Sequence, residues 1–321
     1  MLDWLAYAAL RVVATILHMI PVEICLRMAA AAGTIAYFVL PKKAAHTRRN
    51  LQIAFGHEWS DARIDAVARA SFEHLGMLAV EVMFTPRLIT PLTWSRYVEF
   101  APSVGDVVRM LLERRSAVAM LSAHYGNWEV LGYVLATLGF PNYSIVRPIE
   151  NRRVNELLTG VRERTGQRLI DKKGATAVVR QVIADRGILC VLGDPSGGRK
   201  GVFVNFFGVN SSCHKTIGLM CLNERIPIIV GFSRRLGRRF RFRMECTDVI
   251  RPEEYDGWDR IDALRAITQR FTTGIERAIR RDPAQYLWAY RRFKSRSPAE
   301  LVSCDDRWRD REEDILAGVA G

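Results

Sequence analysis

The stretch AVAMLSAHYGNWEVLGYVL, residues 117–135, decides the fold because it changes from the pattern of a buried strand to that of a helix within a few residues. Residues 116–122 are mostly apolar, as expected for a strand covered on both faces. Gly126 permits a tight turn, and Asn127 is a favourable N-cap for a helix that begins at Trp128. The stretch therefore predicts a strand, a turn and a helix of an α/β sheet.

The same stretch places His124 and Glu129 five residues apart. Within one regular helix, this spacing puts two side chains about 140° apart, so His124 is expected outside the helix and Glu129 in its first turn. The Glu129 carboxylate then reaches back to one imidazole nitrogen, while the other takes a proton from an acceptor hydroxyl. Free N–H groups of the turn are candidates for stabilising an oxyanion or a phosphate. The alternative is a loop histidine and a glutamate that favours the helix dipole.

Two further polar residues follow predicted strands. Arg147 comes after the strand at 142–146, and Asp194 comes after the strand at 187–192. Ligands of open α/β sheets bind beyond the carboxyl ends of the strands, so these residues and His124 are expected at one edge. Arg147 suits a phosphate or carboxylate of a substrate, or else forms a structural salt bridge. Asp194 belongs to the site or simply opens an Asx turn.

The chain is strongly basic, with 47 Lys and Arg against 34 Asp and Glu, a net charge of 47 − 34 = +13. Such a surface favours nucleic acid, an acidic carrier protein or anionic lipid as partner. No aromatic-basic recognition motif is present, so no nucleic acid is expected, although a non-catalytic basic membrane- or nucleic-acid-binding protein remains the alternative of another class. The candidate patch for an acidic carrier protein or for lipid headgroups is Arg234, Arg235, Arg238, Arg239, Arg241 and Arg243.

Common cofactor and metal motifs are missing from the sequence. The six cysteines form no C-x2-C pair, and the six histidines show no zinc-ligand spacing, so no metal is expected. The sequence also lacks a P-loop, a G-x-G-x-x-G motif and a G-x-S-x-G elbow. We therefore expect no cofactor, and chemistry that depends on His124 rather than on a serine nucleophile.

Residues 4–40 are mostly apolar, and Pro21 divides them into two helical halves. The uncharged stretch 28–40 is shorter than the roughly 20 residues that a spanning helix needs. If Arg27 snorkels to the interface, the second half becomes a weak spanning candidate. A buried helical hairpin is the alternative. The basic residues that follow favour a cytoplasmic exit or contact with anionic headgroups, and they are Lys42, Lys43, Arg48 and Arg49.

The rest of the chain alternates between helical and strand patterns. The predicted class is α/β, with a mixed, mostly parallel sheet flanked by helices and an N-terminal membrane-associated helical segment. The predicted units are a hydrophobic membrane anchor at 1–45, an α/β domain with a helical entry segment at 46–296, and a polar tail at 297–321. Predicted helices lie at 60–78, 153–165, 175–185, 216–223 and 260–280, strands at 202–207, 226–232 and 239–244, and a linker at 166–174.

Several motifs together resemble the bacterial lipid A biosynthesis (lauroyl/myristoyl) acyltransferases, a branch of the lysophospholipid acyltransferase-like group. The likeness covers nearly the whole chain, and its most specific block is PAQYLWAYRRFK at 283–294. Tyr290 in this block replaces a histidine that is common in the family. The other motifs are RRNL at 48–51, the block from His124 to Glu129, Arg147-Pro148, Gly193-Asp194, VFV at 202–204 and FFG at 206–208.

This resemblance implies transfer of a fatty acyl chain from acyl carrier protein or acyl-CoA to a hydroxyl of a membrane glycolipid. One such glycolipid is a lipid A precursor, an intermediate of lipopolysaccharide synthesis, and the expected location is the cytoplasmic face of the inner membrane. A phosphatidylinositol mannoside-like or lysophospholipid acceptor stays open as an alternative. The resemblance assigns the base to His124 and its support to Glu129. Arg147, Asp194 and Asn127 are then the substrate-binding candidates.

Overall fold

A seven-stranded sheet forms the centre of the computed structural model, which describes residues 2–146, 151–164, 166–171 and 175–294. The strand order is β1-β9-β8-β2-β5-β3-β4, and the five strands from β8 to β4 run parallel. Strand β9 pairs antiparallel with β8, and β1 pairs parallel with β9. The predicted mixed, mostly parallel sheet is confirmed. The strands are β1 (Val98–Phe100), β2 (Val118–Ser122), β3 (Asn142–Val146), β4 (Arg168–Asp171), β5 (Ile188–Leu192), β8 (Ile228–Arg235) and β9 (Phe242–Ile250).

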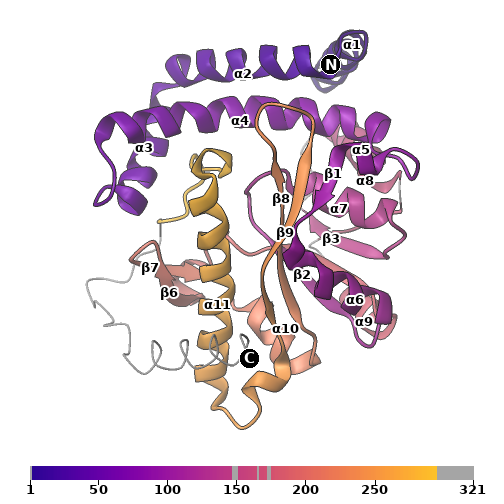
Figure 1. The fold of residues 1–321 in the computed structure, drawn as a ribbon, viewed down its shortest axis with the longest axis vertical. Coiled ribbons are helices and arrows are strands. Elements are labelled where there is room, and N and C mark those ends of the chain that lie inside the picture. The colour runs from indigo at the N-terminus through magenta and orange to yellow at the C-terminus, as the bar shows by residue number, and fades with distance from the viewer. Residues whose placement is uncertain (1, 147–150, 165, 172–174, 295–321) are drawn as a thin grey trace.

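Strand β2 lies near the middle of the sheet, and all five of its residues are buried. Alternate side chains enter different cores, because successive residues of a strand point to opposite faces. Ala119 and Leu121 belong to the core that α10 (Thr216–Glu224) and α11 (Arg260–Arg281) complete. Val118 and Met120 belong to the core that includes α6 (Gly105–Glu113) and α7 (Trp128–Thr137). Figure 1 shows α11 and α7 on opposite sides of the strands.

The outer half of the sheet carries α8 (Arg152–Glu163) and α9 (Ala175–Ala184). The predicted linker at 166–174 is wrong in part, because β4 lies within it and pairs with β3. Only Ile170 of this four-residue edge strand is buried, so the sequence lacks the apolar run that marks an inner strand. A separate hairpin of β6 (Val202–Phe206) and β7 (Val209–Cys213) packs beside α11. The remaining short elements are α5 (Trp94–Tyr97) and 3-10 turns at Pro102–Val104, Gly198–Lys200, Pro252–Tyr255 and Pro283–Gln285.

Four helices at the N-terminus lie over the carboxyl ends of the strands, and Figure 1 shows α2 and α4 side by side along this edge. The N-cap of α4 is Ser60, and the helix continues ten residues beyond the predicted end at 78. Pro21 separates the first two helices, as predicted. The helices are α1 (Leu2–His18), α2 (Val22–Val39), α3 (Pro41–Phe55) and α4 (Asp61–Leu88).

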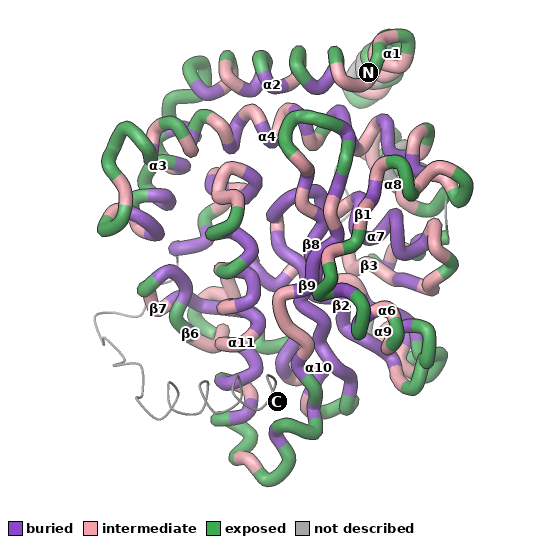
Figure 2. The backbone as a smooth tube through the Cα atoms, viewed as in Figure 1, coloured by how far each residue is buried: buried purple, intermediate pink, exposed green. Residues whose placement is uncertain are grey.

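One helix of the described chain, α2, is long and apolar enough to cross a membrane by length and composition. Only about a quarter of it, 28%, is buried within the fold. Figure 2 shows its buried segments on the side toward α4 and its exposed segments on the outer side. The predicted boundaries of the units stay predictions: the one at 45 falls inside α3, and the tail at 297–321 lies outside the described residues.

Candidate active site

His124 and Asp194 are neighbours because of the register between two parallel strands. Ser122, the last residue of β2, pairs with Leu192, the last residue of β5. His124 and Asp194 each follow two residues later, so they leave the same sheet edge on the same face. The prediction that these two residues lie at one edge of the sheet, beyond the carboxyl ends of the strands, agrees with this geometry.

The imidazole of His124 is held by the buried Asp194 carboxylate. Nδ1 lies 3.0 Å from Oδ1 and 3.1 Å from Oδ2, and the backbone N–H of His124 donates to Oδ1 at 3.1 Å. A carboxylate only accepts hydrogen bonds, so Nδ1 carries the proton and Nε2 is left as the basic nitrogen. The Asp194 side chain is fully buried, whereas 21% of the His124 side chain is exposed. The arrangement leaves Nε2 as the basic nitrogen of a partly exposed side chain, and Asp194 fixes its tautomer.

Burial and charge oppose each other in this pair. Burial alone lowers the pKa of His124, but the charge and hydrogen bond of Asp194 outweigh it, and the net pKa is raised. Burial alone raises the pKa of Asp194, but the charge and hydrogen bonds of His124 prevail, and the net pKa is lowered. Asp194 is therefore ionised at neutral pH, and it stabilises the imidazolium that forms when His124 accepts a proton.

The turn after His124 has the shape that the sequence predicts. Gly126 has a positive φ of 61°, and a Cβ there would clash with the carbonyl of Ser233 on β8. The N–H of Asn127 donates to that same carbonyl at 2.7 Å. The Asn127 side chain caps α7 by accepting from the N–H of Val130 at 3.0 Å. The N-cap prediction is confirmed, and the hydrogen bond to Ser233 fixes the position of the turn relative to β8.

Asn127 is also tied to a buried ion pair that the sequence did not reveal. Its amide Nδ2 donates to Glu81 of α4 at 2.8 Å, and Glu81 accepts from Arg235 of β8 at 2.9 Å. Both ionic side chains are almost completely buried. Asn127 itself is 0% exposed and has both amide groups occupied, so its position suits holding the turn rather than touching a substrate.

Glu129 differs from the expectation in its partner. In the described structure, the carboxylate of Glu129 accepts two bonds from the Arg162 guanidinium, at 2.7 Å and 2.6 Å, and one from Trp128 Nε1 at 3.1 Å. The imidazole Nδ1 donates its hydrogen bond to Asp194 instead. The reason is geometric: the strand register puts Asp194 beside Nδ1, while the first turn of α7 directs Glu129 toward α8. The Glu129 charge still contributes to raising the pKa of His124.

Arg162 was missed because it lies in the last turn of α8, 33 residues after Glu129, without a motif around it. Arg147, predicted to bind substrate, lies outside the described residues. The predicted patch of six arginines is largely wrong as a free surface. Among the described residues, five of the six form ion pairs, and only Arg239 lacks one. The pairs are Arg234 with Glu245, Arg235 with Glu81, Arg238 with Glu73, and both Arg241 and Arg243 with Glu99.

The segment that follows α11 closes the site. The N–H of Leu287 donates to the carbonyl of His124 at 2.9 Å, and the Tyr286 hydroxyl donates to Asp194 Oδ2 at 3.3 Å. The ring of Tyr290 stacks on the imidazole at 5.8 Å between centroids, and Trp128 meets it edge-on at 5.0 Å. The imidazole therefore has an aromatic neighbour on each of two sides.

Two backbone N–H groups beside His124 are open. Within the described part of the chain, the N–H groups of Trp128 and Glu129 have no acceptor, whereas the neighbouring N–H of Val130 is bonded to Asn127. They are the first two N–H groups of α7, where the helix dipole favours negative charge. Such a pair of donors can stabilise an oxyanion.

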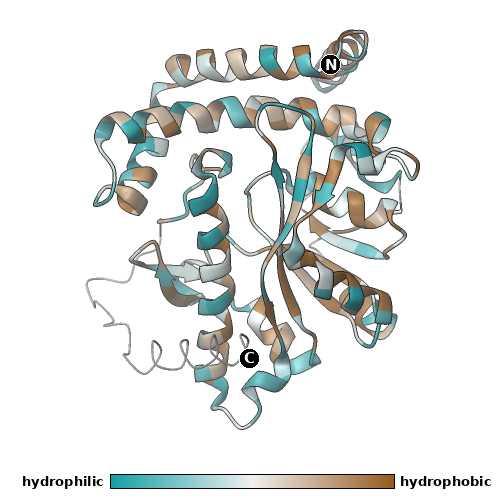
Figure 3. Cartoon of the chain, in the orientation of Figure 1, coloured by the Kyte–Doolittle hydropathy of each residue, from teal (hydrophilic) through white to brown (hydrophobic). Residues whose placement is uncertain are grey.

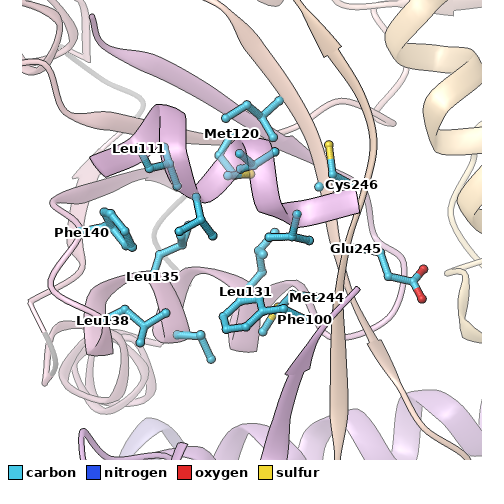
Figure 4. Close-up of a pocket in the computed structure, with 16 residues that line it drawn as sticks. Phe100, Leu111, Met120, Leu131, Leu135, Leu138, Phe140, Met244, Glu245 and Cys246 are labelled. Carbon is cyan, nitrogen blue, oxygen red and sulfur yellow. The ribbon is translucent and has the colours of Figure 1, made fainter. Parts of the chain in front are cut away.

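An apolar cavity of about 300 Å³ lies on the same sheet face as His124, between α6, α7 and the strands (Figure 4). Met120 of β2 forms part of its wall, four residues before His124. The rest of the wall is mostly aliphatic and aromatic and includes Leu111, Leu131, Leu135, Leu138 and Phe140, although Glu245 and Cys246 also line it.

A family model described as bacterial lipid A biosynthesis acyltransferase matches residues 1–295. The chain belongs to this family. The lipid A biosynthesis lauroyltransferase of Escherichia coli (strain K12) is 22% identical over 301 residues, 91% of this chain and 92% of the relative. The lipid A biosynthesis palmitoleoyltransferase of the same strain is 25% identical over 289 residues, 88% of each chain. A lipid A biosynthesis acyltransferase of Haemophilus influenzae is 23% identical over 274 residues, 83% of this chain and 82% of the relative. This member of the lipid A biosynthesis acyltransferases is therefore a transferase of acyl groups, as the resemblance implied.

Proposed function

We propose that the protein transfers a fatty acyl chain from an acyl thioester to a hydroxyl of a lipid A precursor, with His124 as general base and Asp194 as its support. The observation that carries this proposal is a partly exposed imidazole whose Nδ1 is fixed by a fully buried carboxylate, which leaves Nε2 as the basic nitrogen. The family membership supports the same acceptor class.

The reaction needs one base and one oxyanion site. Nε2 of His124 takes the proton of the acceptor hydroxyl while the hydroxyl oxygen attacks the thioester carbonyl. The carbonyl oxygen becomes an oxyanion beside the free N–H groups of Trp128 and Glu129. When the tetrahedral intermediate collapses, the carbon–sulfur bond breaks and the thiolate leaves. The imidazolium returns its proton to that thiolate, so His124 ends neutral and ready for the next cycle.

The remaining site residues have different proposed roles. The ion pair of Glu129 with Arg162 joins α7 to α8 beside His124. Glu129 therefore acts on His124 through its nearby negative charge, instead of through the direct contact first expected. Asp194 and Asn127 are buried, so in this proposal they position His124 and the turn rather than bind substrate. Arg147 keeps its proposed role of binding a phosphate or carboxylate of the substrate, because its planar fork suits such oxygens.

The apolar cavity of Figure 4 is proposed to receive the acyl chain of the donor. Met120 of β2 lines it four residues before His124, and apolar walls with few polar groups are typical of sites for such ligands. The donor is proposed to be acyl carrier protein or acyl-CoA, since both are anionic and the chain is basic. The proposed location is the cytoplasmic face of the inner membrane, where α2 and the basic residues of α3 meet anionic lipid.

The test is an acyl-transfer assay with the purified full chain, an acyl-acyl carrier protein or acyl-CoA donor, and separate acceptors. A lipid A precursor should gain the mass of one acyl group, whereas a lysophospholipid or a mannosylated phosphatidylinositol should not. His124→Ala should abolish the gain while the protein stays folded and membrane-bound. Transfer to a lysophospholipid alone would reassign the acceptor, and near-normal turnover by His124→Ala would reject the base.

A further inference from the structure

Helix α2 has two opposed apolar faces, of which only one is covered. Its inner face is buried against α4 and includes Leu26, Ala30, Gly33 and Tyr37. At about 100° per residue, the exposed side chains lie on the other side of the helix. Figure 3 shows apolar turns of α2 along the rim of the molecule. The exposed stripe is Ile24, Met28, Ile35, Phe38 and Val39, with Ile35 64% and Phe38 67% exposed.

The inner face holds α2 closely on α4. A Cβ at Gly33 would clash with the backbone of Phe72 on α4, and a Cβ at Gly76 of α4 would clash with the carbonyl of Ala29. The two backbones therefore touch at two points where only glycine fits, which is the small-residue packing that lets helices approach closely. Thr34 also donates to Glu73 of α4 at 2.9 Å. These contacts make α2 and α4 one unit.

This unit is incompatible with α2 crossing the bilayer. If α2 spanned and kept its contacts, α4 would enter the hydrocarbon with its charged residues, each costing about 2.5–3.5 kcal/mol at the centre. They are Asp61, Arg63, Asp65, Arg69, Glu73, Glu81 and Arg87. If α2 left α4, the buried face around Gly33 would lose its partner. A helix that lies in the membrane plane keeps both faces satisfied.

A basic notch lies at the edge of the exposed stripe, where α2 meets the tip of the β8–β9 hairpin. It is lined by Glu23, Arg27, Arg238 and Arg239, a sum of three positive and one negative charge. The Glu23 carboxylate is occupied, because it accepts from the N–H of Phe240 at 3.2 Å. Among the described residues, Arg27 and Arg239 form no ion pair. The notch therefore offers unpaired positive charge beside bare apolar surface.

We propose that α2 lies flat on an anionic bilayer, with its exposed stripe at the boundary of headgroups and acyl chains, and that the notch of Arg27, Arg238 and Arg239 binds the phosphate of a lipid headgroup. Charge complementarity and the adjoining apolar stripe both select a lipid surface as the occupant. The proposal does not depend on the acyl-transfer chemistry, and its tests measure only membrane contact.

The first test measures depth in the membrane. A spin label is attached to the full chain at Ile24→Cys, Ala31→Cys or Phe38→Cys, in a background with Cys304→Ser, and its depth in vesicles is measured by electron paramagnetic resonance. For a flat helix, the three labels should lie at one depth. For a spanning helix, positions 24 and 38 would be about 20 Å apart along the bilayer normal, at about 1.5 Å per residue. A middle label deeper than both ends would overturn the proposal.

The second test measures the notch. The double variant Arg27→Gln and Arg239→Gln should bind vesicles that contain phosphatidylglycerol roughly 25-fold more weakly, about fivefold for each arginine. Its binding to neutral phosphatidylcholine vesicles should not change. The matched control is Arg265→Gln, an exposed arginine on α11 without an ion pair in the described structure. An equal loss in the control, or an unchanged affinity of the double variant, would reject the notch.

The third test concerns the stripe. Ile35→Glu should weaken binding to vesicles of either composition by at least about tenfold, because it removes apolar burial and adds a charge at the interface. Ile261→Glu is the control, since Ile261 on α11 is 76% exposed and lies outside the stripe.

Inorganic phosphate should compete no better than chloride at equal ionic strength. Equal effects of the two isoleucine variants, or specific displacement by inorganic phosphate, would contradict a lipid surface as the occupant.

Discussion

Asp194→Asn is the substitution that separates the structure from the sequence-based assignment of Glu129 as the support of His124. The asparagine keeps the shape of the side chain but replaces one carboxylate oxygen with an NH2 donor. Because the backbone N–H of His124 already occupies Oδ1, the amide oxygen takes that position and the NH2 group replaces Oδ2. The NH2 group then lies about 3.1 Å from Nδ1 and donates to it. The proton moves to Nε2, and the base is lost.

The expected decrease in kcat is about 10²–10⁴-fold, the usual contribution of general-base catalysis. The matching Asp→Asn change in a Ser-His-Asp triad costs about 10⁴-fold for the same tautomeric reason. The pKa of His124 should fall, because burial lowers it and the opposing charge of Asp194 is removed. The acid limb of the profile of kcat/KM against pH should therefore move from above about 6.5 to lower pH.

The assay is acyl transfer followed by mass spectrometry between mildly acid and alkaline pH, with NMR titration of the His124 ring in the same samples. Asp106→Asn, at a carboxylate on α6 with 81% of its side chain exposed, is the control and should leave both measurements unchanged. If Asp194→Asn keeps more than about one tenth of the wild-type kcat with an unshifted profile, Asp194 does not support the base.

The remaining predictions concern the other parts of the site. Glu129→Gln should lower kcat/KM about tenfold, since it loses a charge-assisted pair with Arg162, and wild-type activity would remove Glu129 from the site. Leu135→Trp should fill part of the cavity, so kcat/KM against donors of increasing acyl length should peak at a shorter chain, and an unchanged optimum would place the chain elsewhere. The raised pKa of His124 implies that its contribution to stability is complete below about pH 6.5 and is lost as pH rises through the folded value. The Tm difference between wild type and His124→Gln should shrink accordingly, and a constant difference would refute the linkage. Glu81→Ala should destabilise the fold by about 3–5 kcal/mol in denaturant unfolding, because it leaves Arg235 buried without its partner, and a loss below about 1 kcal/mol would contradict that.

The sequence predicts those parts of the fold and site that depend on local patterns. The apolar run of β2 and the cap at Asn127 identify the strand, turn and helix, because burial and capping leave periodic and residue-specific signals. The placement of His124 and Asp194 at one edge of the sheet is also predictable, since both follow inner parallel strands. Strand β4 gave no such signal, because an edge strand with one buried residue has no apolar run.

Contacts between distant segments are what the sequence does not contain. The partner of His124 depends on the register of β2 and β5, and no spacing along the chain states that register. Arg162 and Arg235 are single arginines among many, and only the folded chain shows that each pairs with a half-buried or buried carboxylate. For the same reason, the arginines at 234–243 predict an open basic surface from the sequence. In the folded chain, most of them pair with carboxylates of other residues, as Arg241 and Arg243 do with Glu99.

The closure of the site by residues 283–294 also sets an order of events during synthesis. The N-terminal helices leave the ribosome first, and Asn50 of α3 must wait for Trp288 and Tyr290, whose carbonyls its side chain binds at 2.7 Å and 2.9 Å. At about 5–20 residues per second, this interval lasts roughly 10 to 50 s. A nascent chain therefore carries α2, the helix proposed to contact the membrane, well before the carbonyl of His124 finds the N–H of Leu287. In this proposal, membrane contact precedes catalytic competence, and a prematurely ended chain reaches the lipid without a finished catalytic centre.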